Sequence, residues 1–182
     1  MGLFTPPGLP PLVTIHTYSP ECMGPFLKSS GSTTSPMANA ASASIEAANR
    51  VLYLPFTLGT VITAVQLFSL NGSTAAGNID MGIYDAAGNR RINIGATAQS
   101  GTSVVQAYDI TDTLLEAGRY FLAVVMDGAT GTLFNTTIAG SVAVVLSGKA
   151  QQASATLPAT ATFAAPASGK VPIIGLSTRT VL

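Results

Sequence analysis

One histidine and one cysteine are the first candidates for nucleophilic chemistry in this chain. His16 and Cys22 lie six positions apart in a segment rich in proline. A His–Cys pair reacts only when a scaffold holds the imidazole and the thiol within hydrogen-bond reach of each other, and the spacing indicates no such scaffold. The two residues are also too few ligands for structural zinc. We therefore expect both to pack against a neighbouring subunit, and we predict a protein that is not an enzyme and has no catalytic residue, no bound metal and no cofactor.

Five aspartates lie near the ends of predicted strands or in turns, where oxygen ligands of calcium often collect: Asp80, Asp85, Asp109, Asp112 and Asp127. None forms a D-x-D-x-D-G run, and aspartate is common at turns because it hydrogen-bonds its own backbone. Glu116 is the only glutamate after position 49, so a glycosidase pair would have to be built from aspartates. We favour turn capping for these residues.

The dipeptide Arg90-Arg91 stands at the tip of a predicted hairpin. One interpretation is that it binds an acidic patch on a partner. The other is that both arginines are solvated and keep a strand edge from pairing with another chain. We favour the second interpretation, because exposed charge pairs contribute little binding energy.

The composition of the chain favours association with other subunits. Only 9% of the 182 residues are charged, 47% are hydrophobic, mean hydropathy is +0.45, and eight acidic residues balance eight basic ones. An ordinary soluble domain has about 25% charged residues, and a net charge near zero promotes association. We therefore expect much of the surface to be buried against other subunits.

Three other classes of protein are disfavoured by the same sequence. The apolar runs at 121–126 and 142–146 are far shorter than the ~18–20 residues that a spanning helix needs. Without a net positive charge or a basic stripe, the chain has no source for the phosphate contacts of nucleic-acid binding. The absence of a basic n-region with an apolar h-region argues against a secretory signal, and a lone Cys22 suits assembly in a reducing cytoplasm.

Residues 1–44 differ in composition from the rest of the chain. Seven of the eleven prolines lie there, and each fixes φ and removes an amide donor, so neither a helix nor a central strand is expected. A disordered tail would be polar and charged, whereas this segment is apolar and nearly uncharged until a Ser/Thr/Ala/Gly-rich connector at 28–44. We predict an extended, Pro-rich N-terminal arm that binds a partner through Leu3, Phe4, Leu9, Leu12, Val13, Ile15, Tyr18, Phe26 and Leu27.

Residues 45–182 have the pattern of an all-β domain. Short runs of strand-forming residues alternate with turns about every ten positions, which favours an antiparallel β-sandwich or jelly-roll-like fold. Residues 119–126 are apolar on both faces and predict a central strand covered from both sides, while 111–118 is predicted as a turn region. The predicted strands are 50–58, 61–70, 78–85, 91–94, 102–110, 119–126, 133–138, 141–146, 153–157 and 171–176, with 78–85 and 91–94 forming a hairpin.

Three stretches resemble a β-sandwich that recurs in structural proteins of tailed-phage virions. They are the entry run at 49–56, the "GIYD…G" hairpin at 81–89, and the stretch at 115–125, in which an "L-x-x-G-x-Y" turn leads into a core strand. The resemblance covers less than half of the chain and carries over no catalytic residue. It implies a virion component assembled in the host cytoplasm, whose partners are the major capsid protein or other virion subunits.

We therefore expect a capsid cement or decoration protein that stabilises the capsid lattice through its arm. A homo-oligomer, with a trimer favoured, is implied by the resemblance, and the small side chains of 147–170 suit close packing at such an axis. The alternative is a tail or fibre attachment module, or an adhesin that binds glycan through its loops. Against the glycan alternative, the chain has no tryptophan, and most of its Tyr and Phe residues lie in strand runs where core packing is the default.

Overall fold

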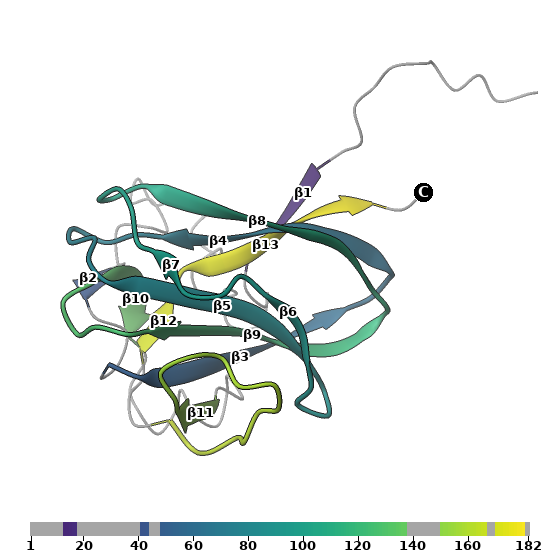
Figure 1. The fold of residues 1–182 in the computed structure, drawn as a ribbon. Coiled ribbons are helices and arrows are strands. Elements are labelled where there is room, and N and C mark those ends of the chain that lie inside the picture. The colour runs from purple at the N-terminus through teal and green to yellow at the C-terminus, as the bar shows by residue number, and fades with distance from the viewer. Residues whose placement is uncertain (1–12, 18–40, 44–47, 138–149, 167–169, 181–182) are drawn as a thin grey trace, which may run out of the picture.

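The computed structural model describes residues 13–17, 41–43, 48–137, 150–166 and 170–180 (Figure 1). Within these ranges the chain is all-β and has no helix, which confirms the predicted class. The strands are β1 (Val13–Thr17), β2 (Ala41–Ala43), β3 (Arg50–Leu58), β4 (Ile62–Leu70), β5 (Asn78–Asp85), β6 (Arg90–Asn93), β7 (Thr97–Ala98), β8 (Val105–Leu115), β9 (Gly118–Met126), β10 (Leu133–Thr137), β11 (Ala150–Ala153), β12 (Lys170–Pro172) and β13 (Ile174–Thr180).

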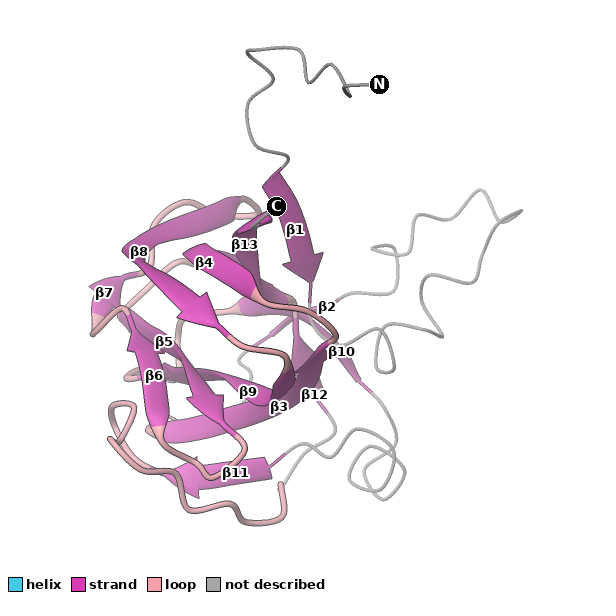
Figure 2. Cartoon of the chain, turned by 90° about the vertical axis from the view of Figure 1, so that its right-hand side faces the viewer, coloured by secondary structure: helices cyan, strands magenta, loops and turns pink. Residues whose placement is uncertain are grey.

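Three antiparallel sheets contain these strands. The first has the order β1-β13-β4-β8, and the second has the order β11-β3-β9-β5-β6 with β7 paired to β5. A small third sheet, β12-β10-β2, lies at one end of the molecule. Figures 1 and 2 show the first sheet above the strands of the second.

The main hydrophobic core takes side chains from both of the larger sheets. Leu52 and Leu122 come from the second sheet, and Leu67 and Leu176 come from the first. All four are at most 2% exposed. Since successive side chains of a strand point to opposite faces, each strand gives the core every second residue.

Strand β9 confirms the prediction of a strand covered on both faces. It pairs with β3 on one side and β5 on the other, and residues 120–126 are all buried. Leu122 and Val124 join the main core, whereas Phe121, Ala123 and Val125 belong to a second cluster on the opposite face of the sheet. A strand buried on both faces needs no polar alternation, which explains its continuous apolar run.

The predicted hairpin of 78–85 and 91–94 is also confirmed, as β5 and β6. Its turn has Gly88 at φ 85°, a left-handed conformation that favours glycine. Pro55 lies in β3 beyond the end of β11, which pairs only with residues 50–53. Among the described strands, this side of β3 is therefore free at Pro55, which suits a residue that has no N–H to donate.

Three predictions of secondary structure were wrong. The single strand predicted at 171–176 is divided, because β12 ends at Pro172 and β13 begins at Ile174 in another sheet. The region 111–118 is not a turn throughout, because β8 continues to Leu115 along β4. Residues 153–157 are not a strand either, because β11 ends at Ala153 and the chain continues as an irregular segment. The strand predicted at 141–146 lies outside the described residues.

Candidate functional site

Residues 150–166, which we call the cover segment, begin as β11 at the edge of the second sheet, and the residues after Ala153 lie over the outer face of that sheet (Figures 1 and 2). Leu157 and Ala150 pack into the second hydrophobic cluster with Val51, Tyr53 and Tyr84. The segment folds back on itself, since Gln151 and Ala164 exchange two backbone hydrogen bonds of 2.9 and 3.0 Å. The segment is therefore a compact loop whose ends are held together, and it helps to bury the outer face of β9.

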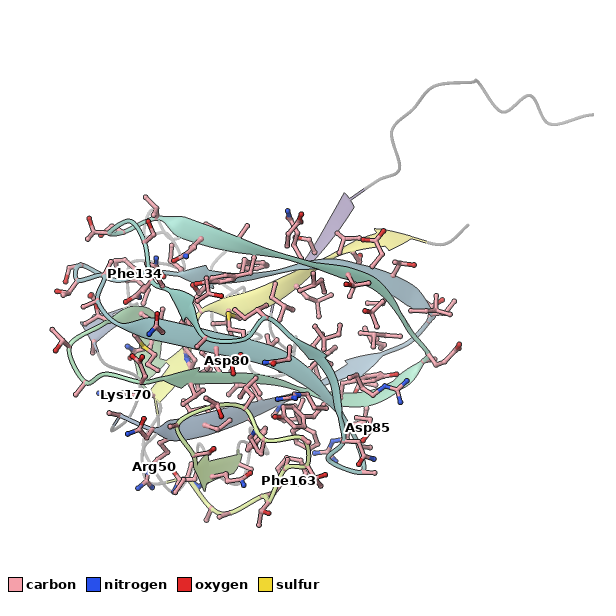
Figure 3. The ribbon with its side chains drawn as sticks, in the orientation of Figure 1. Arg50, Asp80, Asp85, Phe134, Phe163 and Lys170 are labelled. Atoms are coloured by element: carbon pink, nitrogen blue, oxygen red, sulfur yellow. The ribbon has the colours of Figure 1, made fainter. Side chains whose placement is uncertain are left out.

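Asp80 is a buried carboxylate beneath the cover segment. It lies on β5, is 4% exposed, and accepts hydrogen bonds from Asn93 Nδ2 at 2.6 Å and from the backbone N–H of Leu157 at 3.1 Å. Burial raises the pKa of Asp80, and the hydrogen bonds from Leu157 and Asn93 and the charge of Arg90 oppose that rise. Figure 3 shows Asp80 and Asp85 along β5 and Phe163 on the cover segment.

Two tyrosines also fasten the cover segment to the sheet. The rings of Tyr53 and Tyr84 meet edge to face with 5.2 Å between centroids. The Tyr84 hydroxyl donates to the carbonyl of Pro158 at 2.5 Å, and the Tyr53 hydroxyl donates to Gln152 Oε1 at 2.8 Å. Burial raises the pKa of Tyr53 above its ordinary value and that of Tyr84 to about 12, so both remain hydrogen-bond donors at neutral pH.

The interpretation that Arg90 and Arg91 are both solvated is wrong for Arg90. Its guanidinium Nη1 donates to the carbonyl of Leu157, and its backbone N–H donates to Ala159 at 3.0 Å. Arg90 therefore holds the cover segment and is partly buried. Arg91 is the exposed member of the pair, with Asp85 as its partner at 4.0 Å.

The turn-capping prediction is confirmed for Asp85, whereas Asp127 bonds Asn78 at the start of β5. Asp85 Oδ1 accepts from the backbone N–H of Ala87 at 3.0 Å and of Asn89 at 2.9 Å. Asp127 accepts from the backbone and side chain of Asn78 at 2.8 and 2.6 Å, and these bonds lower its pKa.

Asp80 and Asp109 are not turn caps either. Asp80 is buried as described above, and Asp109 accepts a hydrogen bond from Gln66 Nε2 at 3.2 Å, across the β4–β8 pair. Where residues are described, no three His, Cys, Asp or Glu side chains gather closely enough to hold a metal ion.

The sequence did not predict a buried polar network that is centred on Asn71. Asn71 Nδ2 donates to the carbonyl of Ser100 at 2.7 Å and to Gln106 Oε1 at 2.9 Å, while Asn71 Oδ1 accepts from Ser69 Oγ at 3.0 Å and Gln99 Nε2 at 3.2 Å. Asn71 is completely buried. The network joins the loop after β4 to the loop before β8. The Asn71-Gly72 signal indicated only a turn, because a hydrogen-bond partner 28 residues away leaves no local pattern.

Of the arm residues predicted to bind a partner, the structure describes two. Val13 lies opposite Arg179 and Ile15 lies opposite Ser177 in the antiparallel pair of β1 and β13. His16 is in the same strand, opposite Leu176. Cys22 and the remaining predicted contacts lie outside the described residues: Leu3, Phe4, Leu9, Leu12, Tyr18, Phe26 and Leu27.

The described residues thus define an antiparallel all-β protein in which several polar and charged side chains hold the protein's own loops. Comparison with family models, with curated proteins and with solved structures finds no match to the chain. No helix in the described ranges is long and apolar enough to cross a membrane.

Proposed function

We propose that the chain is a non-enzymatic structural protein of a virion, a capsid cement or decoration protein that binds the capsid lattice through its N-terminal arm. The observation that carries this proposal is how the few charges are used. Asp80 is buried, Arg90 binds the cover segment, Asp85 caps the β5–β6 turn and Asp127 bonds Asn78. With 9% charged residues and no net charge in all, little electrostatic repulsion opposes association with other subunits.

The architecture that we propose for this role is a β-sandwich, jelly-roll-like, with an extended arm. Its support is the main core cluster, which takes residues from strands of both larger sheets. The apolar residues of the segment before β2 are the part of the chain that we propose binds a partner.

The cover segment is where we place contacts between copies in a homo-oligomer, with a trimer favoured. Its exposed positions are uncharged, and most of their side chains are small: Ala153, Ala155, Thr156, Ala159, Thr160, Thr162, Phe163, Ala164 and Ala165. Small, uncharged side chains allow two surfaces to approach closely without desolvating a charge.

Burial is the source of binding energy in this proposal. Each apolar arm side chain that is covered contributes about 1–2 kcal/mol before the entropy of ordering is subtracted. Binding should therefore withstand added salt, which screens ion pairs and leaves apolar contacts intact.

The first testable prediction is that arm variants lose attachment. Particles produced without this chain are incubated with the purified full-length protein, with the variant L3S/F4S/L9S, or with the control V104S/V105S/L114S. The control alters three exposed apolar residues of the body. We expect the wild type and the control to sediment with particles at low and high salt, and the arm variant to bind about a hundredfold more weakly or worse, at about tenfold per 1.4 kcal/mol lost.

Equal binding by the arm variant would contradict attachment through the arm. Loss of binding by the control, with the arm variant still bound, would move the contact to the body.

A further inference from the structure

Strand β1 belongs to the fold through one edge only. It pairs with β13 in the antiparallel register Val13↔Arg179 to Thr17↔Gly175, and among the described strands it pairs with no other. Figures 1 and 2 show it at the margin of the first sheet, beside β13. Among the described strands, the backbone pairing that holds β1 is therefore with β13 alone.

Such a contact does not require that both strands come from one chain. An open strand edge presents a row of N–H and C=O groups that accepts any extended segment of compatible register. The β1 of one copy makes these backbone hydrogen bonds with its own β13, and the β13 of a second copy would offer it the same donors and acceptors. The choice between them depends on geometry and on the effective concentration of each β13.

The chain length between β1 and the body permits both arrangements. Residues 18–40 separate Thr17 from β2, and a chain of that length spans up to about 80 Å when extended. A compact domain of this size is about 40 Å across. The tether therefore reaches the β13 of an adjacent copy.

We propose that β1 is an exchanged strand, which pairs with β13 of a second copy of this chain and so links neighbouring subunits. This inference rests on the proposed function, since an assembly supplies the high local concentration that favours exchange. The β13 edge is then occupied by the β1 of a second copy, and residues that precede β1 make the capsid contact. The C-terminal strand is then part of the assembly surface.

Disulfide trapping tests this exchange. In a C22S background, chains that carry I15C are mixed with chains that carry S177C at high protein concentration and oxidised. Ile15 and Ser177 are direct cross-strand partners, and such pairs have Cβ atoms about 4.5–5.5 Å apart, close to the separation that a disulfide needs. A mixture of I15C with A155C is the matched control, because Ala155 is exposed on the cover segment and far from β13 in the pairing order. The I15C/S177C double variant reports pairing within one chain.

We expect the I15C and S177C mixture to give a covalent dimer, with a cross-linked peptide containing both positions, and the control mixture to give far less. A double variant that forms its disulfide within one chain, with no dimer in the mixture, would overturn the exchange. Failure of both the mixture and the double variant would overturn the register itself. This experiment contains no particles, so a negative result contradicts strand exchange and does not affect the test of particle binding. In the same way, a failure of particle binding does not affect a positive cross-link.

Discussion

Asp80 is the residue whose environment has the clearest consequence for stability. Because burial raises its pKa above the ordinary carboxyl value of 3.8, the folded chain binds a proton at this site more readily than the unfolded chain does. Between 3.8 and the raised pKa, the folded state therefore holds more protons, and the contribution of Asp80 to the free energy of unfolding falls as pH increases. Above the raised pKa the contribution is constant and unfavourable. Asp127 acts in the opposite sense, because its pKa is lowered.

The second prediction uses this difference. The free energy of unfolding of the wild type and of D80N is measured by chemical denaturation from acid to neutral pH. Asp127 is present in both proteins, so its effect cancels in the difference between them. We expect the stability of the wild type relative to D80N to decrease as pH rises from about 4 and then to level off. A relative stability that increases over the same range would mean that the pKa of Asp80 is lowered, and would contradict the account of its burial.

The third prediction concerns Asn71, which completes the buried network. In N71A the groups of Ser69 and Gln99 that bond its amide oxygen lose that partner, and the carbonyl of Ser100 loses a donor. Unsatisfied buried polar groups cost about 1–3 kcal/mol each, so we expect a loss of about 2–4 kcal/mol in the free energy of unfolding. T102A, at an exposed position of the adjoining loop, is the control and should change stability little. A loss in N71A no larger than that in T102A would show that the network does not stabilise the fold.

Strands whose burial follows from their own residues were predicted well from the sequence. Residues 119–126 are apolar on both faces, and β9 is covered on both faces. The hairpin of β5 and β6 follows from alternation that is interrupted by a glycine-containing turn. In both cases the local pattern and the final environment agree.

Edge and cover elements were predicted poorly because their structure depends on distant partners. In β8, only Tyr108 and Leu115 are buried, so the polar run Thr111-Asp112-Thr113 has the composition of a turn although it continues an edge strand. The cover segment bonds Asp80, Tyr84 and Arg90, which come from the β5–β6 hairpin. The interactions that hold it are therefore not visible in residues 150–166 alone, and the role of Arg90 could not be predicted from them.

The fourth prediction tests the attachment of the cover segment. Gly82 faces that segment, and a Cβ at this position would meet the backbone carbonyl of Ile92 and lie 2.8 Å from Leu157 Cδ1. G82A should therefore destabilise the protein by about 1–3 kcal/mol and increase amide hydrogen exchange in residues 150–166 more than in β4 or β13. G59A is the control, because nothing lies within 4 Å of a Cβ there. Unchanged exchange in the cover segment of G82A would contradict the close packing of Leu157 against β5.

In the assembly role that we propose, two parts of the chain have different tasks. The body uses charged side chains such as Asp80 and Arg90 to hold its own loops, and its cover segment exposes uncharged side chains that are mostly small. The N-terminal segment that contains β1 has an apolar sequence with few charges. Burial of such surfaces supplies binding energy that changes little with salt, which suits a component that must remain attached to a particle.

The abundance of the chain in purified particles tests the central claim most directly. Quantitative mass spectrometry measures its copy number relative to the most abundant protein of the particle. A cement or decoration protein that covers the capsid lattice should be present at a copy number comparable to that of the major capsid protein. A few copies per particle would contradict the capsid position and favour the tail or fibre, and absence from purified particles would contradict the virion role altogether.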